Sequence, residues 1–241
     1  MRVAAAADLH CRAAQHDQVA ASFASLRGTA DVLLLAGDVT ATGDPEQATV
    51  LADACSGLGI PVFAVLGNHD WHRDRAADIA TILAEAGIVV LDRELGETSA
   101  TCVLAGTRLG IAGVKGFGGG FAGGRLADFG EPLMRELYAE TTADVQALDA
   151  GLRAIADCPV RVVVLHYAPT AATLDGEPAG LWPVLGTDRL AGPIAEHKPD
   201  LVVHGHAHHG ALRGMIGDTP VHNVAVPVMK RDFWHFELDA R

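Results

Sequence analysis

The sequence predicts an α/β fold whose first half is built from parallel strands joined by helices. Three short apolar runs end abruptly in polar residues: Val3–Ala7, Val32–Ala36 and Val62–Leu66. Runs of this length and composition are typical of strands buried on both faces. The residues that follow them, Asp8, Asp38 and Asn68, are 30 positions apart in each interval, which is the length of a βαβ unit.

Helical periodicity accompanies these runs. An apolar stripe with the spacing i, i+4, i+7 follows the first run and is placed to end at Gly28: Val19, Phe23 and Leu26. A second helical stripe follows the third run and is closed by Gly87: Ile79, Ile82, Leu83 and Ala86. The order β-α-β-α-β predicts that the polar residues after the strands meet at the carboxyl edge of one parallel sheet.

The helical period disappears from about Ile88 to Val114, where we expect a second sheet to begin. Short strand-like segments occupy this region: Thr101–Ala105 and Leu109–Val114. A helix that ends before Pro159 follows, with an apolar stripe: Val145, Leu148, Leu152 and Ile155. Two later strands run into histidines: Val160–Leu165 and Leu201–Val203. The tail is predicted to form three consecutive antiparallel strands: Ala211–Ile216, Val221–Val226 and Phe233–Leu238.

Composition bounds the class of protein. The 241 residues, 49% apolar and 20% charged, predict one folded domain over residues 1–241. A net charge of −12 disfavours extended nucleic-acid binding. The four cysteines show no CxxC motif, which favours reduced thiols. The apolar run before Asp8 has five residues, too few for a signal-peptide core, and no stretch approaches the roughly 18 apolar residues of a membrane span. We therefore expect a cytoplasmic protein without a membrane partner.

Residues of metal-binding type follow the strong strands. Seven candidate ligands stand at these positions: Asp8, His10, Asp38, Asn68, His166, His206 and His208. Residues i and i+2 of an extended chain point to the same side, so the DxH and HxH pairs can each present two donors to one place. Imidazole with carboxylate and amide oxygen suits Mn, Fe or Zn. Seven donors exceed the need of one tetrahedral ion and fit two ions that share a ligand.

The five motifs resemble those of the calcineurin-like metallophosphoesterases. They occur in the family's order: Asp8-Leu9-His10, Gly37-Asp38, Gly67-Asn68-His69-Asp70, His166 and Gly205-His206-Ala207-His208. The resemblance covers residues 8 to 208. It implies a four-layer αββα sandwich of two mixed sheets flanked by helices, a dinuclear metal centre at the carboxyl ends of the strands, and hydrolysis of phosphate esters.

The resemblance also assigns roles to single residues. It implies that Asp8, His10 and His208 hold one divalent ion, that Asn68, His166 and His206 hold the other, and that Asp38 bridges both. His69 would face the substrate and protonate the leaving group or stabilise the transition state. We expect Asp70 to orient that imidazole, with helix capping as the competing role, since a helix is predicted to begin near Arg73.

Several neighbouring features are left outside the predicted ligand set. Relatives often carry an acidic residue where this chain has Ala41. This difference bears only on how the local loop is anchored. Three further histidines are expected to be solvated or supporting: His72, His204 and His209. Gly116–Gly124, with six glycines in nine residues, is expected to be a plain loop or a lid, and with Leu174–Val184 to shape the pocket.

We therefore expect the substrate to be a phosphodiester or a small phosphorylated metabolite. A phosphomonoester or a phosphoprotein is the alternative at the same site. An amidohydrolase barrel expects HxH on the first strand, whereas this chain has DxH first and HxH last. A non-catalytic scaffold of the same fold would be expected to lack ligands, and here all seven are present.

Overall fold

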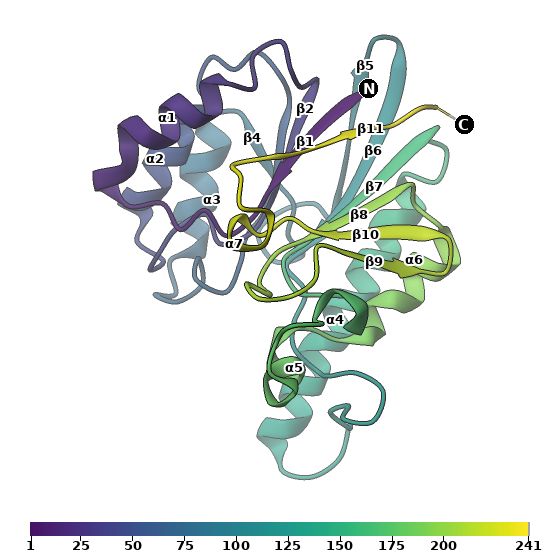
Figure 1. The fold of residues 1–241 in the computed structure, drawn as a ribbon. Coiled ribbons are helices and arrows are strands. Elements are labelled where there is room, and N and C mark those ends of the chain that lie inside the picture. Colours follow the sequence, from purple (N-terminus) through teal and green to yellow (C-terminus); the bar gives the residue numbers. More distant parts are fainter. Residues whose placement is uncertain (241) are drawn as a thin grey trace.

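The computed structural model describes residues 1–240 and contains two β-sheets packed face to face. The first sheet has the order β11-β1-β2-β3-β4. Its strands are β1 (Arg2–Ala6), β2 (Val32–Ala36), β3 (Val62–Val65), β4 (Ile88–Val90) and β11 (Trp234–Glu237). Three helices cover its outer face in Figure 1: α1 (His16–Ala24), α2 (Pro45–Cys55) and α3 (Ala76–Glu85). The parallel strands β1 to β4 confirm the βαβ pattern.

The second sheet has the order β5-β6-β7-β8-β10-β9. Its strands are β5 (Ser99–Leu104), β6 (Thr107–Val114), β7 (Val160–Leu165), β8 (Leu201–His204), β9 (Arg213–Ile216) and β10 (Thr219–Asn223). The helices α4 (Pro132–Ala154) and α6 (Ala191–His197) contact its outer face, which completes the αββα sandwich. Two single-turn helices, α5 (Trp182–Leu185) and α7 (Val226–Met229), lie in connecting segments, as do short 3-10 turns at Ala13–Gln15, Ala171–Thr173, Ala179–Leu181 and Asp188–Leu190.

The main core fills the space between the sheets. Strands β2 and β3 contact β6 and β7 across it, and fully buried side chains such as Leu34 and Ile111 belong to this cluster. A second cluster lies under α4 and α6, with Leu148, Leu152 and Ile194 fully buried or nearly so. Both sheets are therefore covered on both faces, which explains their nearly continuous apolar strands.

The helix expected before Pro159 is confirmed as α4, which begins at Pro132. The structure corrects two of the expected elements. The second sheet begins at Ser99, because β4 pairs in parallel with β3 of the first sheet. The tail does not form three consecutive antiparallel strands, since α7 redirects the chain and β11 pairs antiparallel with β1. β11 thus covers an edge of β1 and packs its apolar face on the main core.

Replacing Leu34 by Ala tests the inter-sheet core. Leu34 is 0% exposed at the centre of β2, so the variant loses transfer free energy and leaves a cavity. We expect the free energy of unfolding in urea to fall by about 2 to 5 kcal/mol. Val103→Ala on β5, where the side chain is 67% exposed, is the control and should change it by less than about 0.5 kcal/mol. Equal effects of both variants would contradict the described core.

Candidate metal centre

The predicted ligands come together where the carboxyl ends of the two sheets meet. Asp8 and His10 follow β1, Asp38 follows β2, and Asn68 follows β3. His166 follows β7 of the second sheet, and His206 and His208 follow β8. Hydrogen bonds join the strand ends, from the amide of Asp8 to the carbonyl of Gly37 and from that of Gly205 to the carbonyl of His166.

The donor atoms form three overlapping groups. Within each group, one donor atom per residue lies within 4.8 Å of the others: Asp8, His10 and His208; His10, Asp38 and His69; Asp38, His166 and His206. Asn68 joins the third group, because its Oδ1 is 2.9 Å from Nε2 of His166. All seven predicted ligands and His69 therefore belong to one continuous cluster.

Asp38 lies at the centre of this cluster and is 1% exposed. Its Oδ1 is 3.3 Å from Nε2 of His166, whereas its Oδ2 is 3.9 Å from Nε2 of both His10 and His69. Oδ1 also accepts a hydrogen bond of 2.9 Å from the amide of His69. The two carboxylate oxygens thus face different groups of donors.

The environment of His166 fits a cation. Its Nδ1 is 2.9 Å from the carbonyl oxygen of Ala36, an acceptor, so Nδ1 carries the proton and donates it. In the neutral ring, Nε2 then presents a lone pair toward two more acceptor oxygens, Oδ1 of Asn68 and Oδ1 of Asp38. Converging acceptors repel one another unless a positive charge lies between them, which is what a metal ion or a proton supplies.

The imidazole of His206 shows the same preparation. Its Nε2 is 3.2 Å from the carbonyl oxygen of Val184, and burial together with His166 lowers the pKa of His206 to about 3. The neutral ring donates from Nε2 and leaves its Nδ1 lone pair free for a metal. His10 differs, because its Nε2 faces Oδ2 of Asp38 while its Nδ1 is buried without a hydrogen-bond partner.

Asp8 holds the motif that carries His206 and His208 in place. It is 3% exposed and accepts hydrogen bonds from the amide of His206 and from Nε2 of His208, the latter 2.9 Å long. Burial pushes the pKa of Asp8 upward, but the bond from His208 and the charge of His166 outweigh burial and hold that pKa below its usual value. The same bond raises the pKa of His208.

The backbone of the cluster is strained. Four of the seven predicted ligands have left-handed φ angles: Asp8 (59°), His10 (47°), Asp38 (51°) and His206 (70°). Such angles are uncommon outside glycine, and each costs on the order of 1 to 3 kcal/mol unless the surroundings compensate. Their concentration where the carboxyl ends of the two sheets meet marks this place as a functional site.

The glycine before three of these motifs makes room for a ligand of another motif. A Cβ on Gly37 would lie 2.4 Å from the His166 ring, and one on Gly67 would lie 2.1 Å from Oδ1 of Asp38. A Cβ on Gly205 would lie 2.5 Å from Oδ2 of Asp8. The glycines of the GD, GN and GH motifs therefore permit the close approach of the strand ends.

Asp70 has a different role from the expected one. It is fully buried, and its carboxylate accepts hydrogen bonds from the amides of Val39, Thr40 and Gly67 and from the hydroxyl of Thr40. Among these hydrogen bonds none comes from the His69 ring, and α3 begins at Ala76 with no side-chain cap, so Asp70 neither orients His69 nor caps the helix. It ties the loop that carries Asp38 to the loop that carries His69.

The imidazole of His69 is oriented by the backbone of Ala41. Nδ1 of His69 is 2.7 Å from that carbonyl oxygen, so Nε2 is directed away from it, toward the cluster and solvent. The side chain is 44% exposed, more than those of His10, His166 and His208. Ala41 could not be identified from its side chain, because the contact is made by a carbonyl group that every residue possesses.

Sequence reasoning missed the aromatic and backbone surroundings of His206. The ring of Tyr167 lies 4.4 Å from the ring of His206, and Tyr167 directly follows His166, a strand-end position that signals a site. His204 is buried, and Nε2 contacts the Thr173 hydroxyl at 2.8 Å. Burial lowers the pKa of His204 to about 4, so it supports the strand end as a neutral group.

The two loops expected to shape the pocket contact each other. The amide of Gly119 donates to the carbonyl of Pro183, and that of Gly120 donates to Gly186. Phe121 is 5% exposed and packs edge-on against Trp182. The first part of the glycine-rich segment is thus packed on α5 rather than extended into solvent.

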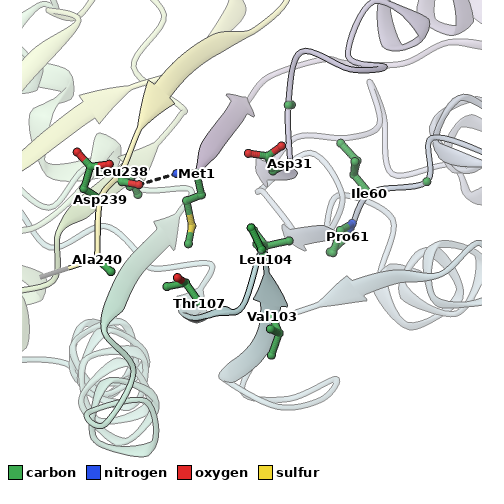
Figure 2. A pocket seen from close by; sticks show the side chains of 13 residues that line it. Met1, Asp31, Ile60, Pro61, Val103, Leu104, Thr107, Leu238, Asp239 and Ala240 are labelled. Atoms are coloured by element: carbon green, nitrogen blue, oxygen red, sulfur yellow. Dashed lines mark hydrogen bonds between the residues drawn. The ribbon is translucent and has the colours of Figure 1, made fainter.

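A separate pocket of about 600 Å³ lies at the opposite end of the strands. Figure 2 shows that Met1, Asp31 and Pro61, which precede β1, β2 and β3, line it together with the β5–β6 turn. It contains none of the predicted ligands.

Among residues 1–240, no helix has the length and apolar character needed to cross a membrane.

Replacing Gly67 by Ala tests the close approach of the motifs. The added Cβ would meet Oδ1 and the amide nitrogen of Asp38 at 2.1 and 2.4 Å, so the carboxylate must move. We expect the Mn²⁺ retained after dialysis, measured by plasma mass spectrometry, to fall at least about tenfold. Gly192→Ala, where a Cβ meets open space, should retain Mn²⁺ like the parent protein. Full retention by Gly67→Ala would contradict this account.

Comparison with known proteins agrees with this geometry. Residues 1–210 match the family model of the calcineurin-like phosphoesterases, and no curated protein sequence gives a match. The phosphopantetheinyl hydrolase of Mycobacterium tuberculosis has a similar structure, with a TM-score of 0.67 and 18% identity over 98% of this chain and 96% of that chain.

Two other structures share the fold. GAP50, the anchor in the inner membrane complex of Plasmodium, has a TM-score of 0.59 and 13% identity over 94% of this chain and 72% of that chain. A putative 5'-nucleotidase of Staphylococcus aureus has a TM-score of 0.54 and 13% identity over 92% of this chain and 48% of that chain. These likenesses concern the fold, whereas the family model covers most of the sequence. The chain therefore belongs to the calcineurin-like phosphoesterases and is a phosphohydrolase.

Proposed function

We propose that the seven clustered residues hold two divalent metal ions that share Asp38. Asp8, His10 and His208 would hold one ion, and Asn68, His166 and His206 the other. The observation that carries this proposal is the Asp38 carboxylate, whose Oδ1 faces His166 while Oδ2 faces His10. The mixture of imidazole, carboxylate and amide donors suits Mn, Fe or Zn. When bound, two such ions supply Lewis-acid chemistry, which withdraws charge from phosphoryl oxygens and activates water.

His69 is the proposed catalytic side chain. Its Nδ1 donates to Ala41, so only the imidazolium, protonated at both ring nitrogens, can donate a hydrogen bond or a proton from the exposed Nε2 to the leaving-group oxygen of a phosphate ester. The ring centroid of His10 is 4.5 Å from that of His69 and limits its rotation. Asp70, proposed from the sequence as a second catalytic residue, acts through the backbone as a positioning residue.

The proposed substrate is a phosphodiester or a small phosphorylated metabolite. The metal cluster offers a local positive site in a protein of net charge −12, which suits a compact anion better than an extended polyanion. A phosphopantetheinyl group and a 5'-nucleotide, named for two similarly folded proteins, are both small phosphorylated groups. Phosphomonoesters and phosphoproteins are the alternatives at the same site.

The four free cysteines agree with a place in the reducing cytoplasm.

Replacing Asp38 by Ala tests the shared ligand. We expect metal-stripped protein to regain hydrolysis of p-nitrophenyl phosphate or bis(p-nitrophenyl) phosphate when Mn²⁺ is added, and the variant to lose at least about a hundredfold in kcat/KM. The preferred ester would separate monoesterase from diesterase activity. Asp218→Asn, an exposed position outside the cluster, is the matched control. Unchanged turnover by the Asp38 variant, or absence of bound metal in the parent protein, would refute the proposal.

Replacing His69 by Ala tests its role in leaving-group departure. Proton donation matters most for a poor leaving group, so kcat/KM for a phenyl ester should fall about tenfold or more beyond the fall for the p-nitrophenyl ester. Bound Mn²⁺ should be unchanged, because the proposed ligands are intact. An equal loss on both esters would show that His69 does not donate the proton.

A further inference from the structure

An apolar pocket of about 330 Å³ lies beside the metal cluster. It is formed by the glycine-rich loop, α4 and α5. The side chains on its wall carry no charge: Phe117, Leu126, Leu137, Tyr167, Pro183 and Val184. Its volume is at the lower end of the range of about 300 to 1,000 Å³ that is usual for small-molecule sites.

Contacts on the pocket wall connect it directly to His206. The Tyr167 ring lies 4.4 Å from the His206 ring and 5.6 Å from the His166 ring. The carbonyl oxygen of Val184 contacts Nε2 of His206 at 3.2 Å. Tyr167 and Val184 therefore belong both to the pocket wall and to the immediate surroundings of the cluster.

The chain leaves this apolar surface partly uncovered. Leu126 and Leu137 are only partly buried although both line the pocket. Of the eight large apolar side chains exposed in the described part of the chain, five lie on the adjoining segments: Phe129, Leu133, Met134, Leu181 and Val184. Exposed apolar surface gathered on neighbouring segments is typical of a binding site.

Charged groups gather on the other side of Phe117. A second pocket, of about 340 Å³, shares this ring and is lined by Lys115, Arg93 and four acidic side chains. The Lys115 ammonium lies 4.9 Å from the Phe117 ring centroid and is held by the carbonyl of Gly116. The ring pair Phe117 and Tyr167, 5.8 Å apart, thus separates a polar compartment from an apolar one.

We propose that the apolar pocket binds an alkyl or aryl substituent of the phosphate ester and makes the enzyme selective for esters that carry one. The proposal rests on the proposed function, because the phosphoryl group must lie at the cluster. The uncharged wall disfavours a charged substituent, which would lose its hydration without gaining a partner.

Binding of alkylphosphonates to the Mn²⁺-loaded protein tests this proposal by calorimetry. Methylphosphonate and hexylphosphonate offer the same anion to the cluster and differ only in apolar length. We expect hexylphosphonate to bind at least about tenfold more tightly, since each buried methylene contributes favourably. Leu137→Asn and Leu126→Asn should each reduce this ratio toward one. Val103→Asn, an exposed apolar position on β5 that lines the pocket at the opposite end of the strands, should preserve it.

The outcomes separate the two proposals. Equal affinities for both phosphonates in the parent protein would overturn the apolar pocket, as would the absence of binding of both in a sample that turns over the p-nitrophenyl esters. A ratio that persists in both Leu137→Asn and Leu126→Asn would also overturn it, because the extra affinity would then arise elsewhere. Turnover of the p-nitrophenyl esters is measured on the same samples. Its absence beside a large affinity ratio would count against the proposed function alone.

Discussion

The buried carboxylate of Asp38 is the constraint on which the rest of the site depends. A charge that is 1% exposed is costly unless partners compensate it, and Asp38 meets imidazoles from both sheets. Asp70 fixes its position, because the Asp70 carboxylate accepts hydrogen bonds from the amides of Val39 and Thr40 after β2 and from the amide of Gly67 after β3. The two sheets cannot separate or slide at this edge without breaking that arrangement.

The fold accepts local strain in order to converge its strand ends. Four predicted ligands have left-handed backbone angles, and three glycines are approached by side chains where no Cβ would fit. These costs are offset by the inter-sheet core, which lies directly beneath and is fully buried along β2 and β7. A stable sandwich of parallel strands thus holds a polar cluster that would not assemble by itself.

The sequence contained most of the site because each motif is local. Asp8, Asp38 and Asn68 follow apolar runs at βαβ spacing, and parallel pairing necessarily brings such positions to one edge. The features of the structure that could not be predicted from the sequence are properties of the folded backbone. The carbonyl of Ala41 that orients His69 has no side-chain signature. The placement of β11 beside β1 depends on the free edge of β1, which exists only once the first sheet has formed.

Selectivity arises from segments that the strand pattern does not determine. The ligands lie on strand ends, whereas Phe117, Leu137 and Val184 come from a loop and two helices that meet only in the folded chain. Hydrogen bonds from Gly119 to Pro183 and from the Thr141 hydroxyl to the Gly118 carbonyl hold these segments together. The same cluster can therefore serve different esters in proteins of one fold, because the loops change the compartments around the phosphoryl group without moving its ligands.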